Sequence, residues 1–182
     1  MTRVLITGGT GGLGSELVPR FADAGYAVRI LSRKPRSPST DPAYEWAQGD
    51  LVTGDGIAEA LAGVDLVVHA ATNPPTGKGD PEGTRSLCAA AKEAGTPHLF
   101  YISIVGVDKI PMPYYDRKLA CERVVEEAAD PWSILRAAPR TEASFAATWR
   151  FLREQPDWPE PEVLRRQAEE RIGPETPATE VV

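Results

Sequence analysis

The sequence predicts an α/β fold built on a doubly wound parallel sheet, and three observations support that prediction. Short apolar runs alternate with longer stretches of helical periodicity from the first residues onward. A glycine-rich turn separates the first apolar run from the first helical stretch. The chain has 182 residues, 42% hydrophobic and 25% charged, which suits one globular domain with a sizeable core. Strands that alternate with helices form a parallel sheet covered on both faces, and right-handed crossovers make the doubly wound topology the expected one.

The first half of the chain predicts four strands and two helices. A β-branched run that ends in glycines indicates a buried parallel strand at 4–6. Apolar residues at helical spacing, closed by Gly25, predict a helix over 13–24. The same reasoning predicts strands at 27–31, 44–48 and 65–70, a short helix at 56–62, and loops at 34–42 and 72–79.

The second half begins with the same alternation and then loses it. We expect a helix at 81–94, a strand at 98–104, a helix at 114–128 and a strand at 132–137. Beyond residue 141 the strand signal ends, and 142–154 and 162–172 have the pattern of amphipathic helices. The prediction is therefore an α/β domain at 1–138 and a helical extension at 139–182, whose end at 173–182 is expected to be disordered.

The turn after the first strand has the spacing of a phosphate-binding loop. Residues 7–14 read Thr-Gly-Gly-Thr-Gly-Gly-Leu-Gly, with glycines in both the G-x-G-x-x-G register and the wider G-x-x-G-x-x-G register. Glycine permits a tight turn, close approach of a pyrophosphate and close packing of helix on strand, and the helix N-terminus then offers N–H groups. The alternative is a glycine-rich turn without a ligand, but the strand before it and the helix after it are the context that this motif requires. We therefore predict a dinucleotide-binding Rossmann fold, with cofactor contacts from Gly8, Thr10, Gly11, Gly12, Leu13 and Gly14.

The end of the second strand indicates which dinucleotide is bound. NAD sites place an acid there to hold the ribose 2′-hydroxyl. This chain instead has Ser32, Arg33 and Lys34, and the first acidic residue after the strand is Asp41. A guanidinium forms a bidentate pair with a 2′-phosphate, so the sequence predicts NADP, with NAD as the less favoured cofactor. The alternative is that Arg33 and Lys34 are ordinary solvated loop charges.

Two further strand ends fit a bound dinucleotide. Asp50 and Leu51 follow the third strand and are predicted to border the adenine. Ala70, Ala71 and Thr72 follow the fourth strand, where ligands of open α/β sheets bind. Plain packing at the strand ends is the alternative for both groups.

A tyrosine and a lysine four residues apart form the candidate catalytic pair. Tyr114 and Lys118 share one face of the helix predicted at 114–128. A nearby ammonium stabilises a phenolate, which makes the tyrosine a usable acid and base at a carbonyl or alcohol oxygen. A surface helix with scattered polar groups is the alternative.

Taken together, the glycine turn, the strand 99–103, the Tyr114 and Lys118 pair and the segment 133–136 resemble the short-chain dehydrogenase/reductase superfamily. Segment 101–108 and the Pro-Tyr-Tyr at 113–115 are similar to its atypical, NmrA-like NAD(P)H-binding branch. The resemblance covers about residues 1–138. It implies that Tyr114 is the catalytic acid and base and that Lys118 holds the nicotinamide ribose while polarising Tyr114.

The resemblance has two departures. Extended members often carry two serines at the end of the fifth strand, whereas this chain has Ser103 followed by Ile104, so Ser103 either assists catalysis or only caps the strand. Members of this kind also continue for about another hundred residues, and the segment after Ala138 does not resemble that region. A natural truncation, a frame-shifted end and a tail that closes the site in an oligomer are all compatible with this.

These residues support two functions. The favoured one is an NADP-dependent oxidoreductase acting on a small carbonyl or alcohol substrate, and the alternative is a non-catalytic NAD(P)-binding sensor or regulator. The net charge of −6, without a basic stripe, argues against a nucleic-acid partner. We expect no membrane span, no signal peptide and a cytoplasmic location, because no apolar run reaches about 20 residues.

The remaining polar and aromatic residues predict structure rather than chemistry. His69 and His98 are interpreted as core or strand-end residues, and Cys88 and Cys121 as small buried residues, so no metal site is expected. The extension carries large apolar side chains that are suited to packing on the sheet or on a second subunit, which suggests a homo-oligomer. These residues are Trp149, Phe151, Leu152 and Trp158.

Overall fold

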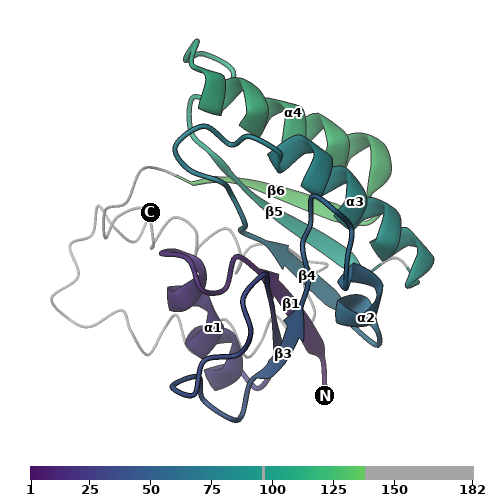
Figure 1. Ribbon diagram of the computed structural model, residues 1–182. Helices are drawn as coiled ribbons and strands as arrows, with labels where there is room; N and C mark the ends of the chain where they lie inside the picture. The colour runs from purple at the N-terminus through teal and green to yellow at the C-terminus, as the bar shows by residue number, and fades with distance from the viewer. Residues whose placement is uncertain (96, 138–182) are drawn as a thin grey trace, which may run out of the picture. The chain divides into compact units, whose positions relative to one another are not determined.

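The computed structural model describes residues 1–95 and 97–137, which form one six-stranded sheet in the order β3-β2-β1-β4-β5-β6 (Figure 1). This is the strand order of the doubly wound dinucleotide-binding fold, so the predicted fold class is confirmed. The strands are β1 (Arg3–Thr7), β2 (Ala27–Ser32), β3 (Glu45–Gln48), β4 (Leu66–His69), β5 (His98–Ile104) and β6 (Trp132–Ala137). The helices are α1 (Gly14–Asp23), α2 (Ile57–Leu61), α3 (Asp80–Glu93) and α4 (Pro113–Ala128).

The ends of the predicted helices and strands agree with the observed ends or differ from them by one residue. Helix α1 ends at Asp23 with Ala24 as its C-cap, and Gly25 follows with φ of 88°, a conformation that glycine adopts without strain. The N–H groups of Gly25 and Tyr26 turn back to the carbonyls of Ala22 and Phe21 and satisfy the last turn. The helices predicted at 142–154 and 162–172, the expected disorder at 173–182 and the aromatic residues of the extension lie outside the described residues.

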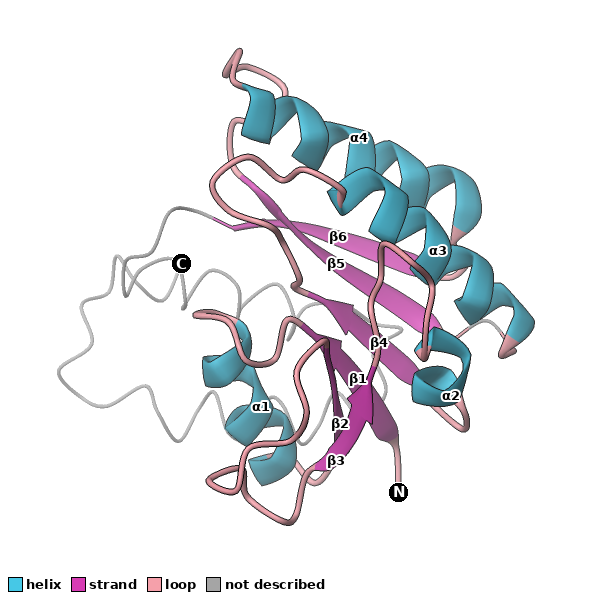
Figure 2. Cartoon of the chain, in the orientation of Figure 1, coloured by secondary structure: helices cyan, strands magenta, loops and turns pink. Residues whose placement is uncertain are grey.

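Helices cover the two faces of the sheet (Figure 2). Alternate residues of a strand point to opposite faces, and one set of strand residues packs with α2, α3 and α4. That core contains Leu5, Val67, Leu99, Leu87 and Val125, all exposed by 1% or less. Helix α1 buries Leu17, Val18 and Phe21 on the other face, where β1 and β2 also bury Val4, Ile6, Val28 and Ile30.

The strand register brings the predicted site residues that follow β1, β2, β3 and β4 to the carboxyl end of the sheet. The described pairings of β1 with β2 and β4, of β2 with β3, and of β4 with β5 are parallel. One row of paired residues crosses the sheet through Ala47, Leu31, Thr7, His69 and Tyr101. The first four strands end in this row or one residue beyond it, so the segments that follow them gather where ligands of this fold bind.

Candidate dinucleotide and active site

The glycine turn after β1 is held by close backbone packing. Gly8 has φ of 72°, and a Cβ there would lie 2.7 Å from Cα of Ala71. Gly14 begins α1, and a Cβ on it would lie 2.6 Å from Cα of Gly9. Contacts this short exclude any side chain, so these two glycines are required by the fold. They also bring the turn against Ala70 and Ala71 at the end of β4, two residues that the sequence predicted beside the cofactor.

The next part of the turn presents backbone N–H groups. The N–H of Gly11 closes the turn on the carbonyl of Gly8 at 2.9 Å. Within the described residues, the N–H groups of Gly12, Leu13 and Gly14 donate to no protein acceptor. Gly11 and Gly12 are exposed, and the positive end of the α1 dipole lies behind them. Donors of this kind fit a pyrophosphate.

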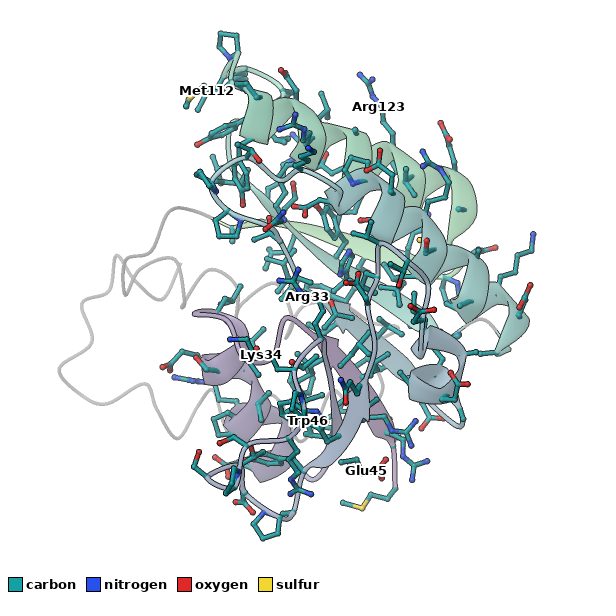
Figure 3. All side chains as sticks on the ribbon, in the orientation of Figure 1. Arg33, Lys34, Glu45, Trp46, Met112 and Arg123 are labelled. Carbon is teal, nitrogen blue, oxygen red and sulfur yellow. The ribbon has the colours of Figure 1, made fainter. Side chains whose placement is uncertain are left out.

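Arg33 and Lys34 project from the end of β2 and are exposed (Figure 3). Their backbone is fixed by the neighbouring strand: the Trp46 indole donates to the carbonyl of Lys34 at 3.1 Å, and the Gln48 amide donates to that of Arg33 at 3.3 Å. Ser32 caps the bend by accepting the N–H of Lys34. The backbone of Arg33 and Lys34 is thus held by hydrogen bonds, while both cationic side chains extend from the end of β2.

Asp50 and Leu51 lie on the loop after β3. The N–H of Gly49 donates to the carbonyl of Ser32, so this loop begins beside the end of β2. The Asp50 carboxylate accepts the N–H of Val52 at 2.8 Å. Leu51 packs toward α3, because a Cβ on Gly83 would lie 3.0 Å from the Leu51 Cβ. The structure therefore places both residues at the predicted edge and gives each of them a structural contact as well.

A buried histidine joins the two central strands to α3. The Thr84 hydroxyl donates to the carbonyl of Asp80, so its oxygen accepts the Nε2–H of His69 at 3.0 Å. The other ring nitrogen, Nδ1, then accepts the Thr7 hydroxyl at 2.7 Å, and Thr7 Oγ1 accepts the N–H of Ala71. Burial, with a smaller contribution from the Lys118 charge, lowers the pKa of His69 to about 3. His69 is therefore a neutral core residue that fixes the end of β4 beside the glycine turn.

Tyr114 lies at the start of α4, half-buried against the loop that follows β4. Its hydroxyl oxygen is 3.5 Å from Oγ1 of Thr72, and its ring meets that of Tyr115 edge-on at 6.0 Å between centroids. The Thr72 hydroxyl donates to Oδ2 of Asp80 at 2.6 Å. The structure thus brings together two predicted site residues, Thr72 and Tyr114, from different elements.

Lys118 is buried, with 4% of its surface exposed. Its ammonium donates to the carbonyl of Ile102 at 3.1 Å and lies 4.9 Å from the centroid of the Tyr101 ring. Burial lowers its pKa below the ordinary value, against an opposing effect of nearby groups that include Asp80 and Glu122. Within the described residues the ammonium forms no ion pair and no hydrogen bond to Tyr114. A buried ammonium with one acceptor retains N–H groups that can bind a ligand.

Ser103 is the second-last residue of β5 and lies on the same face of the sheet as Tyr101. Its side chain is buried, and its hydroxyl has no hydrogen-bond partner among the described residues. A buried hydroxyl without a protein partner is uncommon and is available to bind a ligand oxygen. This agrees with a role beyond capping the strand.

Asp80 is the polar residue of this region that sequence reasoning missed. The predicted helix began at Pro81, whereas α3 begins at Asp80. The N-cap rule provided a signal, because an aspartate directly before a helical proline is a typical helix start. Residues 1–95 and 97–137 hold no cluster of three His, Cys, Asp or Glu residues able to bind a metal ion. None of the helices in that part of the chain is both long and apolar enough to cross a membrane.

The strand order, the glycine turn with its available N–H groups and the gathering of strand ends at one edge define a Rossmann-fold dinucleotide-binding protein. The family model described as NAD(P)H-binding matches residues 8–168, and the chain belongs to this family. The predicted relation to the short-chain dehydrogenase/reductase superfamily is confirmed, and the cofactor is a nicotinamide dinucleotide.

Two curated relatives and one solved structure illustrate this relation. The (4-alkanoyl-5-oxo-2,5-dihydrofuran-3-yl)methyl phosphate reductase of Streptomyces griseus is 36% identical over 149 residues, which are 80% of this chain and 50% of that protein. The photosystem II assembly factor Ycf39 of Synechocystis is 30% identical over 75% of this chain and 44% of its own length. The triphenylmethane reductase of Citrobacter, complexed with NADP(H), has a TM-score of 0.68 at 22% identity, over 82% of this chain and 55% of its own. The chain thus spans about half the length of these proteins, and the solved structure shows the fold alone.

Proposed function

We propose that the protein is an NADPH-dependent reductase of small carbonyl compounds, with Tyr114 as the proton donor. The observation that carries this proposal is the contact between the hydroxyl oxygens of Tyr114 and Thr72, 3.5 Å apart, because it brings the Tyr114 phenol next to the segment that follows β4. The reductase among the relatives supports the reaction class.

The preference for NADPH rests on Arg33 and Lys34 in the absence of a neighbouring acid. A charge-assisted pair contributes roughly 1.5–3 kcal/mol, so NADPH should bind about tenfold or more tightly than NADH. Calorimetric titration of both dinucleotides tests this, and Arg33→Ala should narrow the difference. Arg36→Ala is the matched control, because the Arg36 guanidinium is already bonded to the carbonyl of Asp41 in the same loop. Equal affinities in the unmodified protein would contradict the preference.

The side chains around Tyr114 divide the chemistry between them. NADPH, when bound, supplies the hydride. The Tyr114 hydroxyl gives its proton to the substrate oxygen, and the positive charge of Lys118 stabilises the phenolate that remains. The hydroxyl of Ser103, which has no hydrogen-bond partner among the described residues, is the second donor that we propose for the same oxygen.

The segment that leads into α4 favours an apolar substrate. Val105 and Met112 expose 51% and 52% of their surface, and Ile110 exposes 37%. Met112 directly precedes the helix of Tyr114 (Figure 3). Neighbouring exposed apolar side chains beside a site are typical of a ligand-binding wall.

The test of catalysis is NADPH oxidation, followed by absorbance, across aldehydes, ketones and quinones. Tyr114→Phe should lower turnover by about 10²–10⁴-fold while NADPH binding stays nearly intact. Tyr115→Phe is the matched control, because it removes the same hydroxyl from the adjacent ring. A substantial wild-type rate that Tyr114→Phe leaves unchanged would refute the role of this tyrosine.

One observation favours a second function, a non-catalytic NAD(P)-binding regulator. The described hydrogen bond of Lys118 goes to the carbonyl of Ile102 rather than to Tyr114. One of the relatives is an assembly factor and is not named as an enzyme, which supports this alternative. Tight NADPH binding without oxidation by any compound of the panel is the outcome expected for this function.

A further inference from the structure

We propose that Thr72 and Asp80 are positioning residues that orient the Tyr114 hydroxyl for proton transfer to the substrate. The inference rests on the proposed function, because it assigns the partners of the proposed acid. Thr72 follows β4, Asp80 begins α3 and Tyr114 lies in the first turn of α4, so three segments meet at one point.

The direction of the hydrogen bonds follows from their geometry. The Thr72 hydroxyl donates to Oδ2 of Asp80 at 2.6 Å, and its longer contact to the Tyr114 oxygen, at 3.5 Å, also has threonine as the donor. The phenol oxygen therefore accepts from Thr72, and the phenol's own proton is left to donate to the substrate oxygen.

The Asp80 carboxylate is itself held in place. Its Oδ1 accepts the N–H of Asn73 at 3.0 Å, and it lies in the first turn of α3, where the helix dipole favours a negative charge. The carbonyl of the same residue accepts the Thr84 hydroxyl that bonds His69. Asp80 therefore links Thr72 to the rigid centre of the sheet.

The loop between Thr72 and Asp80 also contacts the helix of Tyr114. Gly77 has φ of 70°, and a Cβ there would lie 3.5 Å from Cδ2 of Tyr114 and 3.2 Å from Oδ2 of Asp80. The Arg117 guanidinium donates to the carbonyl of Thr76 at 2.7 Å. The 3.5 Å between Tyr114 and Thr72 is longer than an ordinary O–H···O bond, and a small rotation of the ring closes it. Catalytic hydrogen bonds often shorten in this way when a ligand binds.

The first test needs no substrate. The ring Cζ signals of the five tyrosines are recorded in protein labelled at that carbon, with and without NADP⁺, and Tyr114→Phe and Tyr115→Phe assign two of them. Thr72→Val should move the Tyr114 signal and leave that of Tyr115 in place, Asp80→Asn should move it in the same direction, and Thr72→Ser should restore it. Thr53→Val is the matched control, because Thr53 makes the same kind of bond to Asp55, at 2.8 Å, on another loop. A Tyr114 signal that Thr72→Val leaves unchanged in both states, or that Thr53→Val moves equally, would overturn the proposal.

The second test separates this inference from the proposed function. Thr72→Val should lower kcat about tenfold while the Kd of NADPH changes much less, Thr72→Ser should recover the rate, and Thr72→Val should have no further effect in a Tyr114→Phe background. If Tyr114→Phe itself leaves the rate unchanged, the proposed function fails. If Tyr114→Phe abolishes the rate but Thr72→Val does not lower it, this inference alone fails. If no compound is reduced, the tyrosine signals decide the inference.

Discussion

The turn after β1 and the segment from β5 into α4 lie at the same end of the sheet. The first offers backbone groups to a ligand, whereas the second offers side-chain groups. The turn presents backbone N–H groups, and its geometry depends on glycines that tolerate no side chain. The β5–α4 region presents side chains, among them a buried ammonium and a buried hydroxyl. A backbone site is a property of local sequence, whereas the chemistry of a side-chain site depends on what the fold places around each group.

His69 connects the two regions, and acid should therefore weaken both. Its pKa is about 3 in the folded protein because of burial and about 6.5 in the unfolded chain. Between these values the unfolded chain binds a proton that the folded protein does not, so stability falls as pH falls through this window. The slope approaches about 1.4 kcal/mol per pH unit, several kcal/mol in all. Urea unfolding at a series of pH values measures this dependence.

A variant of that histidine isolates its contribution. His69→Asn should be less stable at neutral pH and should lose this part of the acid dependence, while His98→Asn, which alters the only other histidine, should retain it. An unchanged slope in a folded His69→Asn protein would show that another group causes the acid dependence.

The turn itself should control binding without controlling folding, provided that the right glycine is changed. A side chain at Gly14 would collide with the backbone of Gly9, but a Cβ at Gly11 meets only the carbonyl oxygen of Gly8, at 3.2 Å. Gly11→Val should therefore fold and bind NADPH at least about 100-fold more weakly, because its side chain fills space that the pyrophosphate needs. Calorimetry measures the affinity, and Ala62→Val, at an exposed position at the end of α2, is the control. Retained affinity in folded Gly11→Val would place the dinucleotide elsewhere.

The comparison also explains how much the sequence could predict. Periodicity and glycine positions predicted the sheet, its helices and the phosphate turn, because strand alternation and positive φ are local requirements. Tyr114 and Lys118 were found by their spacing, but spacing did not reveal that the Lys118 ammonium bonds the carbonyl of Ile102. Asp80 was missed because its importance comes from Thr72 and Asn73, which approach it only in the folded chain.

Substitution of the buried Lys118 is expected to have the smallest effect on stability. It also contrasts most clearly with the glycine turn, whose residues are required by the fold. A buried ammonium with one carbonyl acceptor is costly, so Lys118→Met, of similar length and apolar, should stabilise the protein by about 1 kcal/mol at neutral pH. The folded-state pKa of Lys118 is lowered by burial, so the ammonium destabilises the fold below that pKa. The stability advantage of methionine should therefore shrink as pH rises toward about 10.

The same variant should weaken NADPH binding and turnover, since a group kept at a cost in stability is expected to serve function. Urea unfolding of Lys118→Met beside Lys92→Met, an exposed lysine on α3, measures the difference. A loss of stability larger than about 1 kcal/mol in Lys118→Met would mean that the ammonium supports the fold itself, and the β5–α4 region would then resemble the glycine turn in serving structure first.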